Sequence, residues 1–515
     1  MPQPLDQAGV AKLMSRLQAE LDSRQPKIKR WGDYYDGDHD LAFATDKFQE
    51  AFGGLFAGFA DNWCGVVCDS PSERLAPIGF RFGDGTVKPA GQEGQPANPG
   101  VGDRDAMDIW QRNDMDAEAQ LLILGSITES RSFVLVWGDE EDDHPVITGE
   151  DASEVVVAYE PGSRRQRKAA LKQWTDDDGQ EHATVYTPDY LYKLKRRRGS
   201  QIAVTTSTSG PSTMLWVPQS ARGSVGVTMA TAWEPRTGDQ SQDIVENPLG
   251  KVPIVELSNR PRLRKKPTAE HDQVIPLQGA VNKLVADLMV TSEGAAFPAR
   301  WATGLDAPRD PRTGQEIKDP ELWRVALSKL VRSRNKDAKF GNFDAADLSN
   351  FVVGIDLLIQ HIAALTHTPP HYMLAKMVNA SGDALTVSEA GLVAKCRDKT
   401  DVLGNAFEEV MRLAFACLDD PRADVYTAET IWRDVEHRTE ASRVDAMVKK
   451  KEAGVPWRQR MEDAGYTPAQ IERMIEMRRQ DAEMDAAGLG LADKPTDVAD
   501  GEEDEPEDTD VDPVD

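Results

Sequence analysis

The sequence predicts an α+β protein in which helices predominate. Apolar residues recur at three- and four-residue steps over long stretches towards both ends of the chain, which is typical of helices. A central block instead carries short runs of β-branched and aromatic residues separated by turn signals. With 515 residues and 40% hydrophobic side chains, the chain is long enough for roughly two to four domains with buried cores.

Amphipathic helices are predicted in the N-terminal part of the chain. Residues 5–24 place Val and Leu at helical spacing on one face. A second helix is predicted over residues 46–69, where Phe, Leu and Trp share one side and three glycines permit close packing. Residues 83–102 are rich in Gly and Pro and are predicted to form a loop. Helical patterns return over residues 103–130.

The central block predicts a sheet of short strands. Asp178-Gly179 is a hairpin turn signal inside it. Residues 199–225 are rich in Ser, Thr and Gly and are predicted to be an exposed excursion, and Val252–Leu257 is predicted as the last strand. The other predicted strands are residues 133–137, 154–159, 169–174, 183–186 and 190–195.

The C-terminal half is predicted to be mainly helical. A helix over residues 272–297 leads into a mixed and locally basic segment, 298–346. The next helix is apolar on several faces, which requires neighbours on several sides, and Pro369 and Pro370 end it. The remaining predicted helices are 385–418 and three shorter ones within 427–487.

The charge of the chain narrows the class of partners. The formal net charge is −27, and the tail from residue 493 to residue 515 contributes −11 of it, which leaves −16 for the rest. A protein that coats DNA through its phosphates is basic overall, so the composition argues against that class. A protein that surrounds DNA without gripping it remains compatible with this charge.

Four cysteines do not make a disulfide framework in a chain of this length. Their spacing indicates reduced, buried thiols. The first residues lack the basic and apolar regions of a signal peptide. The most apolar segment, Leu348–Thr366, contains Asp356 and His361 and is therefore expected to be a buried helix and not a membrane span. We expect a protein of the reducing cytoplasm, or of a particle assembled there.

No motif selects an enzymatic reaction. Asp36, Asp38 and Asp40 alternate around His39, but a calcium loop would need Gly and Glu where Leu41 and Lys47 stand, so a polar turn is favoured. His361, His367 and His371 do not form a helical metal motif, because prolines separate the last two, and packing or capping histidines are favoured. Phosphate loops, dinucleotide fingerprints and nucleophile elbows are absent from the sequence.

Four basic runs leave two interpretations open. Each run has the charge to contact phosphate, but solvated faces or contacts with acidic neighbours are favoured over DNA contacts. The aromatic residues near the first run are interpreted as packing anchors. The four runs are residues 27–30, 164–168, 195–198 and 262–266.

Short motifs follow one another in a specific order along most of the chain. They are Tyr34-Tyr35-x-Gly37, Asn247-Pro248-Leu249-Gly250-x-Val252-Pro253, Arg260-Pro261, Asn282, Phe343 with Asp347-Leu348-Ser349-Asn350, Thr368-Pro369-Pro370 and Asn379-x-Ser381-Gly382-x-Ala384. Their order and spacing, from about residue 25 to residue 420, resemble the portal protein, or head-to-tail connector, of long-tailed bacteriophages.

The resemblance implies a portal-type subunit with wing, stem, clip and crown regions, assembled into a ring around a central channel. It implies no enzymatic activity and no cofactor or metal. The implied regions are a wing at 1–270 that includes the β-rich part, a stem helix at 271–297, a clip at 298–346, a returning stem helix at 347–367, a tunnel loop at 368–384, a long wing helix at 385–420, a crown at 421–490 and a disordered acidic tail at 491–515.

The resemblance also implies a function and partners. The ring, typically of twelve subunits, would sit at one capsid vertex of the virion and pass double-stranded DNA during packaging and ejection, without reading its sequence. It would be assembled in the bacterial host cytoplasm, and the membrane is not an expected partner. Terminase, head-tail adaptors, and the major capsid and scaffolding proteins would be its other partners.

The residues expected to matter for function have a mechanical role in the passage of DNA and not a catalytic one. From the tunnel loop, Lys376, Asn379 and Ser381 would face passing DNA. At the clip, four cations would line or flank the opening: Arg332, Arg334, Lys336 and Lys339. The alternative from another class is a DNA-processing enzyme with a divalent-metal carboxylate site, and a third is a non-viral helical interaction protein.

Overall fold

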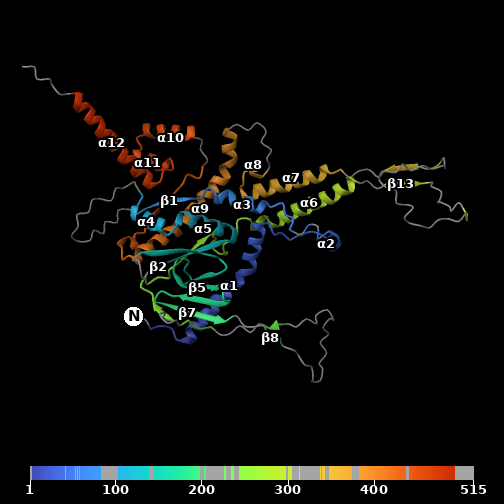
Figure 1. The fold of residues 1–515 in the computed structure, drawn as a ribbon, viewed down its shortest axis with the longest axis horizontal. Helices are drawn as coiled ribbons and strands as arrows, with labels where there is room; N and C mark the ends of the chain where they lie inside the picture. Colours follow the sequence, from blue (N-terminus) through green and yellow to red (C-terminus); the bar gives the residue numbers. More distant parts are fainter. Residues whose placement is uncertain are drawn as a thin grey trace, which may run out of the picture.

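The computed structural model shows a layered body from which a helical hairpin and a group of C-terminal helices extend (Figure 1). It describes residues 3–40, 42–52, 54, 56, 58–82, 102–138, 144–197, 202–203, 226–227, 233–236, 243–296, 300–303, 312–313, 337, 339–342, 347–373, 382–436 and 440–492. The predicted loop at 83–102, the excursion at 199–225 and the acidic tail lie almost entirely outside these residues.

The body is built from two stacked antiparallel sheets with a helix layer on each side. One sheet has the strand order β10-β7-β6-β5-β4, with β11 also pairing with β7, and the other has the order β12-β2-β3. The strands of the two sheets are β2 (Arg131–Gly138), β3 (Pro145–Glu150), β4 (Val155–Tyr159), β5 (Arg167–Thr175), β6 (Gln180–Tyr186), β7 (Tyr190–Arg197), β10 (Glu234–Pro235), β11 (Ile244–Glu246) and β12 (Ile254–Ser258).

Alternation along the strands produces the layers, because successive side chains point to opposite faces. In β4, Val155 and Val157 pack between the two sheets, while Val156 packs against α1 on the outer face of the larger sheet. In β2, Phe133 lies between the sheets and Val134 faces the opposite helix layer, which includes α5 and α9. The core is therefore continuous through the stack.

Helix α1 (Gln7–Asp36) is longer than the predicted helix over 5–24. It begins at Asp6, whose side chain accepts a hydrogen bond from the Gly9 backbone N–H, and it ends at Gly37 in the left-handed region (φ 87°). The predicted apolar face is confirmed, since Val10, Leu17 and Leu21 are buried against the larger sheet.

The other N-terminal predictions hold in part. The single helix predicted over 46–69 is wrong, because α2 (Asp46–Phe52) and α3 (Trp63–Ser72) are separate. The glycines that suggested close packing lie near the break, and Gly58 has a positive φ of 74°. The helical region 103–130 is confirmed as α4 (Arg104–Arg112) and α5 (Met115–Glu129).

The predicted strands are confirmed, and the turn Asp178-Gly179 joins β5 to β6 with Gly179 at φ 73°. The sequence analysis missed β3, and it missed the pairing of β1 (Pro77–Arg81) with β15 (Glu429–Trp432). The last central strand, β12, begins at Ile254, two residues later than predicted, because Pro253 precedes it. Further two-stranded pairings are β8 (Ile202–Ala203) with β9 (Gly226–Val227), and β13 (Arg300–Thr303) with β14 (Lys339–Asn342).

The C-terminal half is helical, as predicted. After the short helix η2 (Asp272–Val274), the main helices are α6 (Ile275–Ala296), α7 (Ser349–Thr366) and α9 (Gly382–Cys417), with the short α8 (Pro370–Met373) before α9. Three helices follow in the region predicted to hold three shorter ones, but the last of them, with 25 residues, is longer than α6 and α7 and runs past residue 487. After the short helix η4 (Pro421–Asp424), they are α10 (Glu440–Glu452), α11 (Trp457–Asp463) and α12 (Pro468–Ala492).

Candidate functional site: a helical hairpin and its junction with the body

Helices α6 and α7 form an antiparallel hairpin that projects from the body (Figure 1). One face of each helix packs on the other and on α3, through a cluster that includes Val281, Ile359 and Ile362. A Cβ built on Gly354 would lie 3.4 Å from Leu284 Cδ1, so the two helices approach each other closely at this glycine. The hairpin is thus held at its base by the body and by its own apolar seam.

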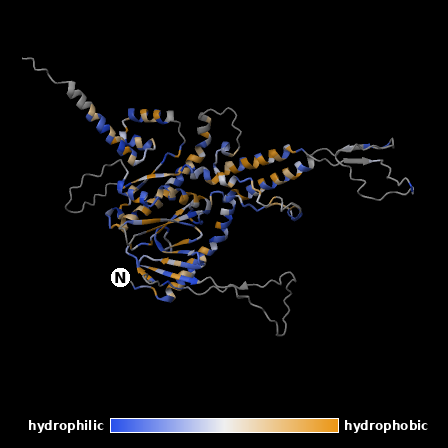
Figure 2. Cartoon of the chain, viewed as in Figure 1, coloured by the Kyte–Doolittle hydropathy of each residue, from blue (hydrophilic) through white to orange (hydrophobic). Residues whose placement is uncertain are grey.

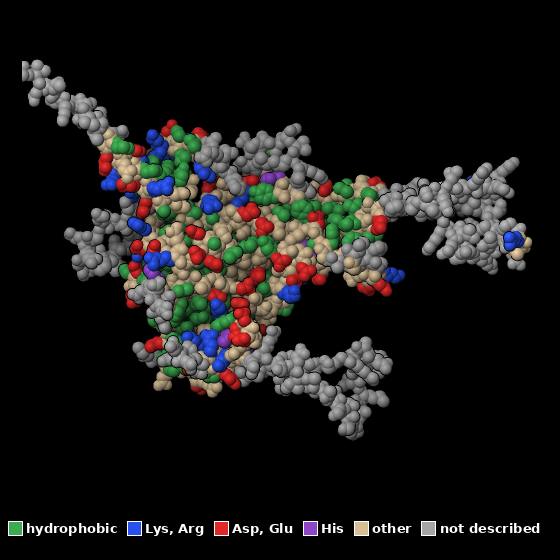
Figure 3. Space-filling view, viewed as in Figure 1, with side chains coloured by type: hydrophobic (Ala, Val, Ile, Leu, Met, Phe, Trp, Pro, Cys, Tyr) green, Lys and Arg blue, Asp and Glu red, His purple; other side chains and the backbone are tan. Residues whose placement is uncertain are grey.

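The outer face of α7 is apolar and exposed. Hydrophobic residues predominate along this helix (Figure 2). Only 22% of the residues of Ser349–Thr366 are buried, so the expectation of a buried helix is wrong for the single subunit. The exposed fractions are 47% for Val352, 67% for Val353, 50% for Leu357 and 50% for Leu365. In the space-filling view, hydrophobic side chains gather along this arm (Figure 3).

Among the described residues, α7 is the one helix with the length and composition to cross a membrane. That test is weak evidence, because helices that pack against protein pass it as well. Helix α7 packs along α6 over one face, and Asp356 lies within its span. The exposed apolar face therefore requires another protein surface to remove it from water.

A buried ionic cluster joins the base of the hairpin to the larger body. Glu270, which is 1% exposed, lies 2.7 Å from Lys399 Nζ and 3.4 Å from Lys395 Nζ, and both lysines belong to α9. Lys399 also donates to the Asn259 side chain, and Lys395 donates to the Thr366 carbonyl at 2.7 Å. The end of α7, the approach to α6 and the middle of α9 are therefore fixed together.

The electrostatics of the cluster follow from its burial. Burial by itself raises the pKa of Glu270, but Lys399 and Lys395 more than offset this and lower the pKa to about 2. Burial and repulsion from Lys399 lower the pKa of Lys395, while Glu270 opposes that change. A cavity of about 500 Å³ lies beside the cluster and is lined by Asn259, Glu270 and both lysines, among other residues.

His271 is a second buried contact at the same junction. It is fully buried, its Nε2 lies 3.0 Å from the Trp31 carbonyl of α1, and its Nδ1 lies 3.1 Å from Cys68 Sγ of α3. Burial lowers the pKa of His271 to about 4, so the ring is neutral near pH 7. Trp31 Nε1 also donates to Asp272 Oδ1 of η2 at 2.7 Å, so α1 is linked twice to the segment that leads into α6.

A clamp of charged and aromatic residues holds the two ends of the segment that connects α8 to α9. Arg74, after α3, lies 3.0 Å from Glu389 of α9 and donates to the Tyr372 hydroxyl of α8 at 2.5 Å. It also donates to the Val435 carbonyl at 3.0 Å. The hydrogen bonds to Tyr372 and Glu389 raise the pKa of Arg74 against the effect of burial. We call this contact the Arg74 clamp.

Only one of the seven predicted site residues lies within the described residues. Lys376, Asn379, Ser381, Arg332, Arg334 and Lys336 lie outside the described residues. Lys339 is exposed in β14, where it pairs with Thr303 of β13. The Arg74 clamp and the ionic cluster were missed, because their members lie far apart in the sequence and no local pattern marks them.

The candidate metal residues do not converge. His39 donates from Nε2 to the Tyr34 carbonyl at 2.9 Å and accepts at Nδ1 from the Asn282 side chain of α6 at 2.9 Å, so it fixes the end of α1. His367 caps α7 in the left-handed region, and His371 lies 3.6 Å from Glu389. Within the described ranges there is no group of three or more ligating side chains.

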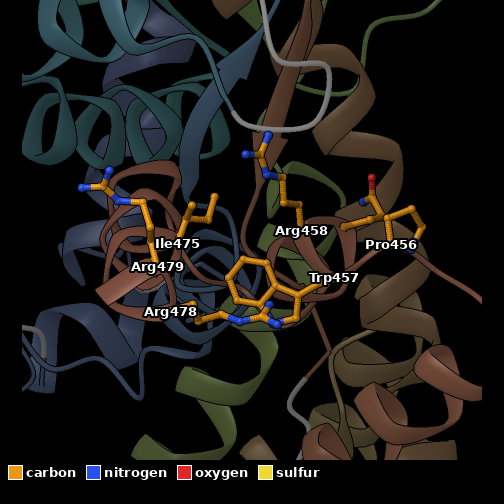
Figure 4. A pocket seen from close by; sticks show the side chains of 7 residues that line it. Pro456, Trp457, Arg458, Ile475, Arg478 and Arg479 are labelled. Atoms are coloured by element: carbon orange, nitrogen blue, oxygen red, sulfur yellow. The ribbon is translucent and has the colours of Figure 1, made fainter. Parts of the chain in front are cut away.

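A shallow pocket of about 520 Å³ lies between α11 and α12 (Figure 4). The Arg478 guanidinium lies over the Trp457 ring, 4.7 Å from its centroid, and Arg479 pairs with Glu476 at 2.9 Å. Arg458 also lines the pocket. No carboxylate, histidine or cysteine is among the lining residues, so the pocket offers no group for acid–base or metal chemistry.

Comparisons with known proteins show which protein family the chain resembles over most of its length. The sequence profile described as phage portal protein, SPP1 Gp6-like, matches residues 15–480. The portal protein of Mycobacterium phage D29 is 28% identical over 446 residues, which cover 83% of this chain and 79% of the relative. The portal protein of Mycobacterium phage L5 is 27% identical over 438 residues, with the same coverage of 83% and 79%.

Two solved structures are similar at lower levels. They are the virion of a native gene transfer agent particle (TM-score 0.39, 10% identity, 80% of this chain and 90% of that one) and the neck of an empty particle of that kind (TM-score 0.42, 9% identity, 81% and 92%). These scores are too low to carry an argument. The match to the family profile covers most of the chain and establishes the family: the chain belongs to the phage portal protein family of the SPP1 Gp6-like type.

The resemblance noted in the sequence is thereby confirmed. A portal protein is a structural component of the phage particle at the capsid vertex, and the alternative of a DNA-processing enzyme gains no support. The predicted fold class, α+β with helices predominating, is confirmed as well.

Proposed function

We propose that this chain is the subunit of a ring, typically of twelve copies, that surrounds a channel for double-stranded DNA at one capsid vertex. The observation that carries the proposal is the exposed apolar face of α7. A hairpin that leaves Val353 67% exposed and Leu357 50% exposed requires cover. Neighbouring copies supply that cover in a closed ring, through a heterologous contact repeated around the axis.

The regions of the chain take their roles from this arrangement. We assign α6 and α7 to the stem, residues 298–346 to the clip and residues 368–384 to a tunnel loop that projects into the channel. The body with its two sheets is the wing, α9 is the long wing helix, and residues 421–490 form the crown. The Arg74 clamp then sits at the base of the tunnel loop, where it fixes the two ends of a segment exposed to moving DNA.

The charge of the chain suits a conduit. DNA slides through a channel only if its phosphates are not held, and a basic lining would bind them with release of counterions. A net charge of −27 repels the duplex and keeps it away from the wall. The cations that we assign to contact with DNA lie in two places, the tunnel loop with Lys376 and the clip with Arg332, Arg334, Lys336 and Lys339. Asn379 and Ser381 add uncharged polar contacts in the loop.

The partners follow from the position at the vertex. We propose that the clip docks terminase during packaging and head-tail adaptor proteins afterwards, and that the wing meets the major capsid and scaffolding proteins. Assembly takes place in the bacterial host cytoplasm. Neutral replacements of Lys376 and of the clip cations are expected to lower the amount of DNA packaged or retained, while an unchanged amount would count against these roles.

The ring is tested by native mass spectrometry and negative-stain imaging of the purified protein. The wild type is expected to form closed rings with a central hole. The double variant Val353→Glu, Leu357→Glu is expected to stay unassembled but folded, because it places charges on the proposed contact. Val448→Glu in α10 is the matched control, since Val448 is also 50% exposed. Rings of the double variant that equal those of the wild type would contradict the proposed interface.

A further inference from the structure

Two of the basic runs in the sequence meet on one surface of the body. Arg164, in the turn between β4 and β5, donates to the Arg262 carbonyl at 3.0 Å, although the two residues are 98 positions apart. The segment that follows β12 therefore lies against that turn. Its cations Arg262, Arg264, Lys265 and Lys266 are all exposed. A protein with a net charge of −27 thus gathers a concentrated positive surface here.

A groove of about 630 Å³ opens at this surface, and we call it the basic groove. Helix α1 forms one wall, β4 and the end of β12 form the floor, and the segment 261–267 forms the opposite wall. Seven cations and two carboxylates are among the lining residues. The charged set comprises Arg16, Arg24, Arg131, Arg164, Arg262, Lys265, Lys266, Glu20 and Glu256.

The two carboxylates of the groove are already engaged. Glu256, at 7% side-chain exposure, lies 3.0 Å from Arg131 Nη1 and accepts a bond from the Tyr159 hydroxyl at 3.1 Å. Glu20 lies 3.2 Å from Arg24 Nη2 and 2.7 Å from Lys266 Nζ. The positive charge of Arg16, Arg262 and Lys265 is not paired with any carboxylate of the described residues.

Arg24 carries a buried N–H group that lacks a hydrogen-bond acceptor among the described residues. Its side chain is only 10% exposed, and its Nη1 atom is buried without a hydrogen-bond partner in the part of the chain that is described. A buried N–H group without an acceptor destabilises the fold, and more so when the group is charged. Burial and the nearby Arg131 lower the pKa of Arg24, which shows how poorly this charge is compensated. An anion bound in the groove would supply compensating charge beside Arg24.

We propose that the basic groove docks a carboxylate-rich, extended protein segment of a partner. The depth of Arg24 favours a peptide over duplex DNA, because an Asp or Glu side chain can enter a recess that a convex phosphate backbone cannot reach. Pro267, which is half-buried, also lines the groove and offers an apolar contact. At the rim, Leu263 is 84% exposed and can contact an apolar residue of the segment. The inference does not depend on ring assembly.

The test uses the purified full chain and a fluorescein-labelled synthetic peptide of repeated Glu-Leu-Asp units, followed by fluorescence anisotropy. A peptide of Gln-Leu-Asn units is the uncharged control. Saturable binding of the acidic peptide, weakened by added salt, is expected. Lys265→Glu is expected to weaken binding about three- to tenfold, and Arg24→Gln about thirtyfold, because the latter removes a buried charged donor.

Lys451→Glu in α10 is the matched control, since it makes the same charge change at an exposed lysine elsewhere. Thermal unfolding of each variant checks the fold, and Lys265→Glu remains informative if Arg24→Gln does not fold. Equal binding of the uncharged peptide, no saturable binding, or equal losses in Lys451→Glu would overturn the proposal. Labelled duplex DNA that binds more tightly than the peptide and depends on Lys265 would overturn it in favour of nucleic acid. Imaging of the same variants reports ring formation separately.

Discussion

At the scale of single residues, the contacts that hold the hairpin to the body are buried ionic and polar groups. Glu270 and Lys399 are 129 positions apart, so nothing in the local sequence pairs them. Removing one partner of a buried pair leaves the other charge uncompensated, which costs about 3–5 kcal/mol. The prediction of reduced, buried thiols is confirmed for Cys64, Cys68 and Cys396, whereas Cys417 is free but only partly buried.

His271 makes stability depend on pH. Its pKa is about 4 in the folded chain, below the ordinary value of 6.5, so between these values only the unfolded chain takes up the proton. The stabilisation is complete above pH 6.5 and is lost progressively down to pH 4, by up to about 3 kcal/mol. Urea unfolding of the wild type and of His271→Gln as a function of pH measures the effect.

The comparison with the variant is necessary because other groups titrate in the same range. Burial raises the pKa of Glu129 to about 7, which stabilises the fold as the pH falls and opposes the His271 trend. The difference between wild type and His271→Gln is therefore expected to shrink as the pH is lowered from 7 towards 4. A difference that does not change with pH would mean that His271 is not buried in its neutral form.

At the scale of elements, periodicity predicted the helices and strands well, and breaks were harder to predict. The region 46–69 was predicted as one helix because its apolar face continues across the break between α2 and α3. Only the glycines and Asn62 mark that break. Asn62 is the N-cap of α3, and its side chain accepts a hydrogen bond from the Gly65 backbone N–H. Strand β3 was missed although it is no shorter than β4 and β12, because it follows an acidic run and carries few apolar residues. Hydrogen bonding to β2, which no sequence pattern reports, makes it a strand.

The C-terminus of α1 offers a matched pair of glycine substitutions. Gly37→Ala is expected to destabilise the fold by about 1–2 kcal/mol, because φ is 87° there and an L-residue is strained in that region. Gly32→Ala, in the same helix, is expected to stabilise it by about 0.5–1 kcal/mol, since a Cβ there meets nothing within 4 Å. Denaturant unfolding of both variants measures the difference, and equal effects would contradict the assignment of the helix end.

At the scale of the whole molecule, the acidic composition argued against a protein that coats DNA through its phosphates. The order of the motifs predicted the portal family. The layering of two sheets between helices could not be predicted, because it depends on which strands pair across distances of more than a hundred residues, as β2 does with β12. The basic groove escaped prediction for the same reason. Its two basic runs were recognised separately, and only the fold brings them together.

The overall charge leads to a prediction about DNA. Truncation after Ala492 removes −11 of charge and leaves −16, so the shortened chain is still acidic. Both the full and the truncated chain are therefore expected to leave a labelled duplex unshifted in an electrophoretic mobility assay at physiological salt. A salt-sensitive shift with the truncated chain alone would mean that the tail, and not the body, keeps DNA from binding.

Helix α9 has a mechanical consequence. Its 36 residues span about 54 Å. Within that length lie, in order, the Glu389 contact of the Arg74 clamp, the lysines of the ionic cluster and Glu408, which accepts a bond from the Thr430 backbone N–H of β15 at 3.2 Å. A single unbroken helix is stiff along its axis, so a displacement of one end is transmitted to the other. Force applied to the segment before Gly382 therefore displaces the paired strands β1 and β15, because α9 contains no break that could act as a hinge.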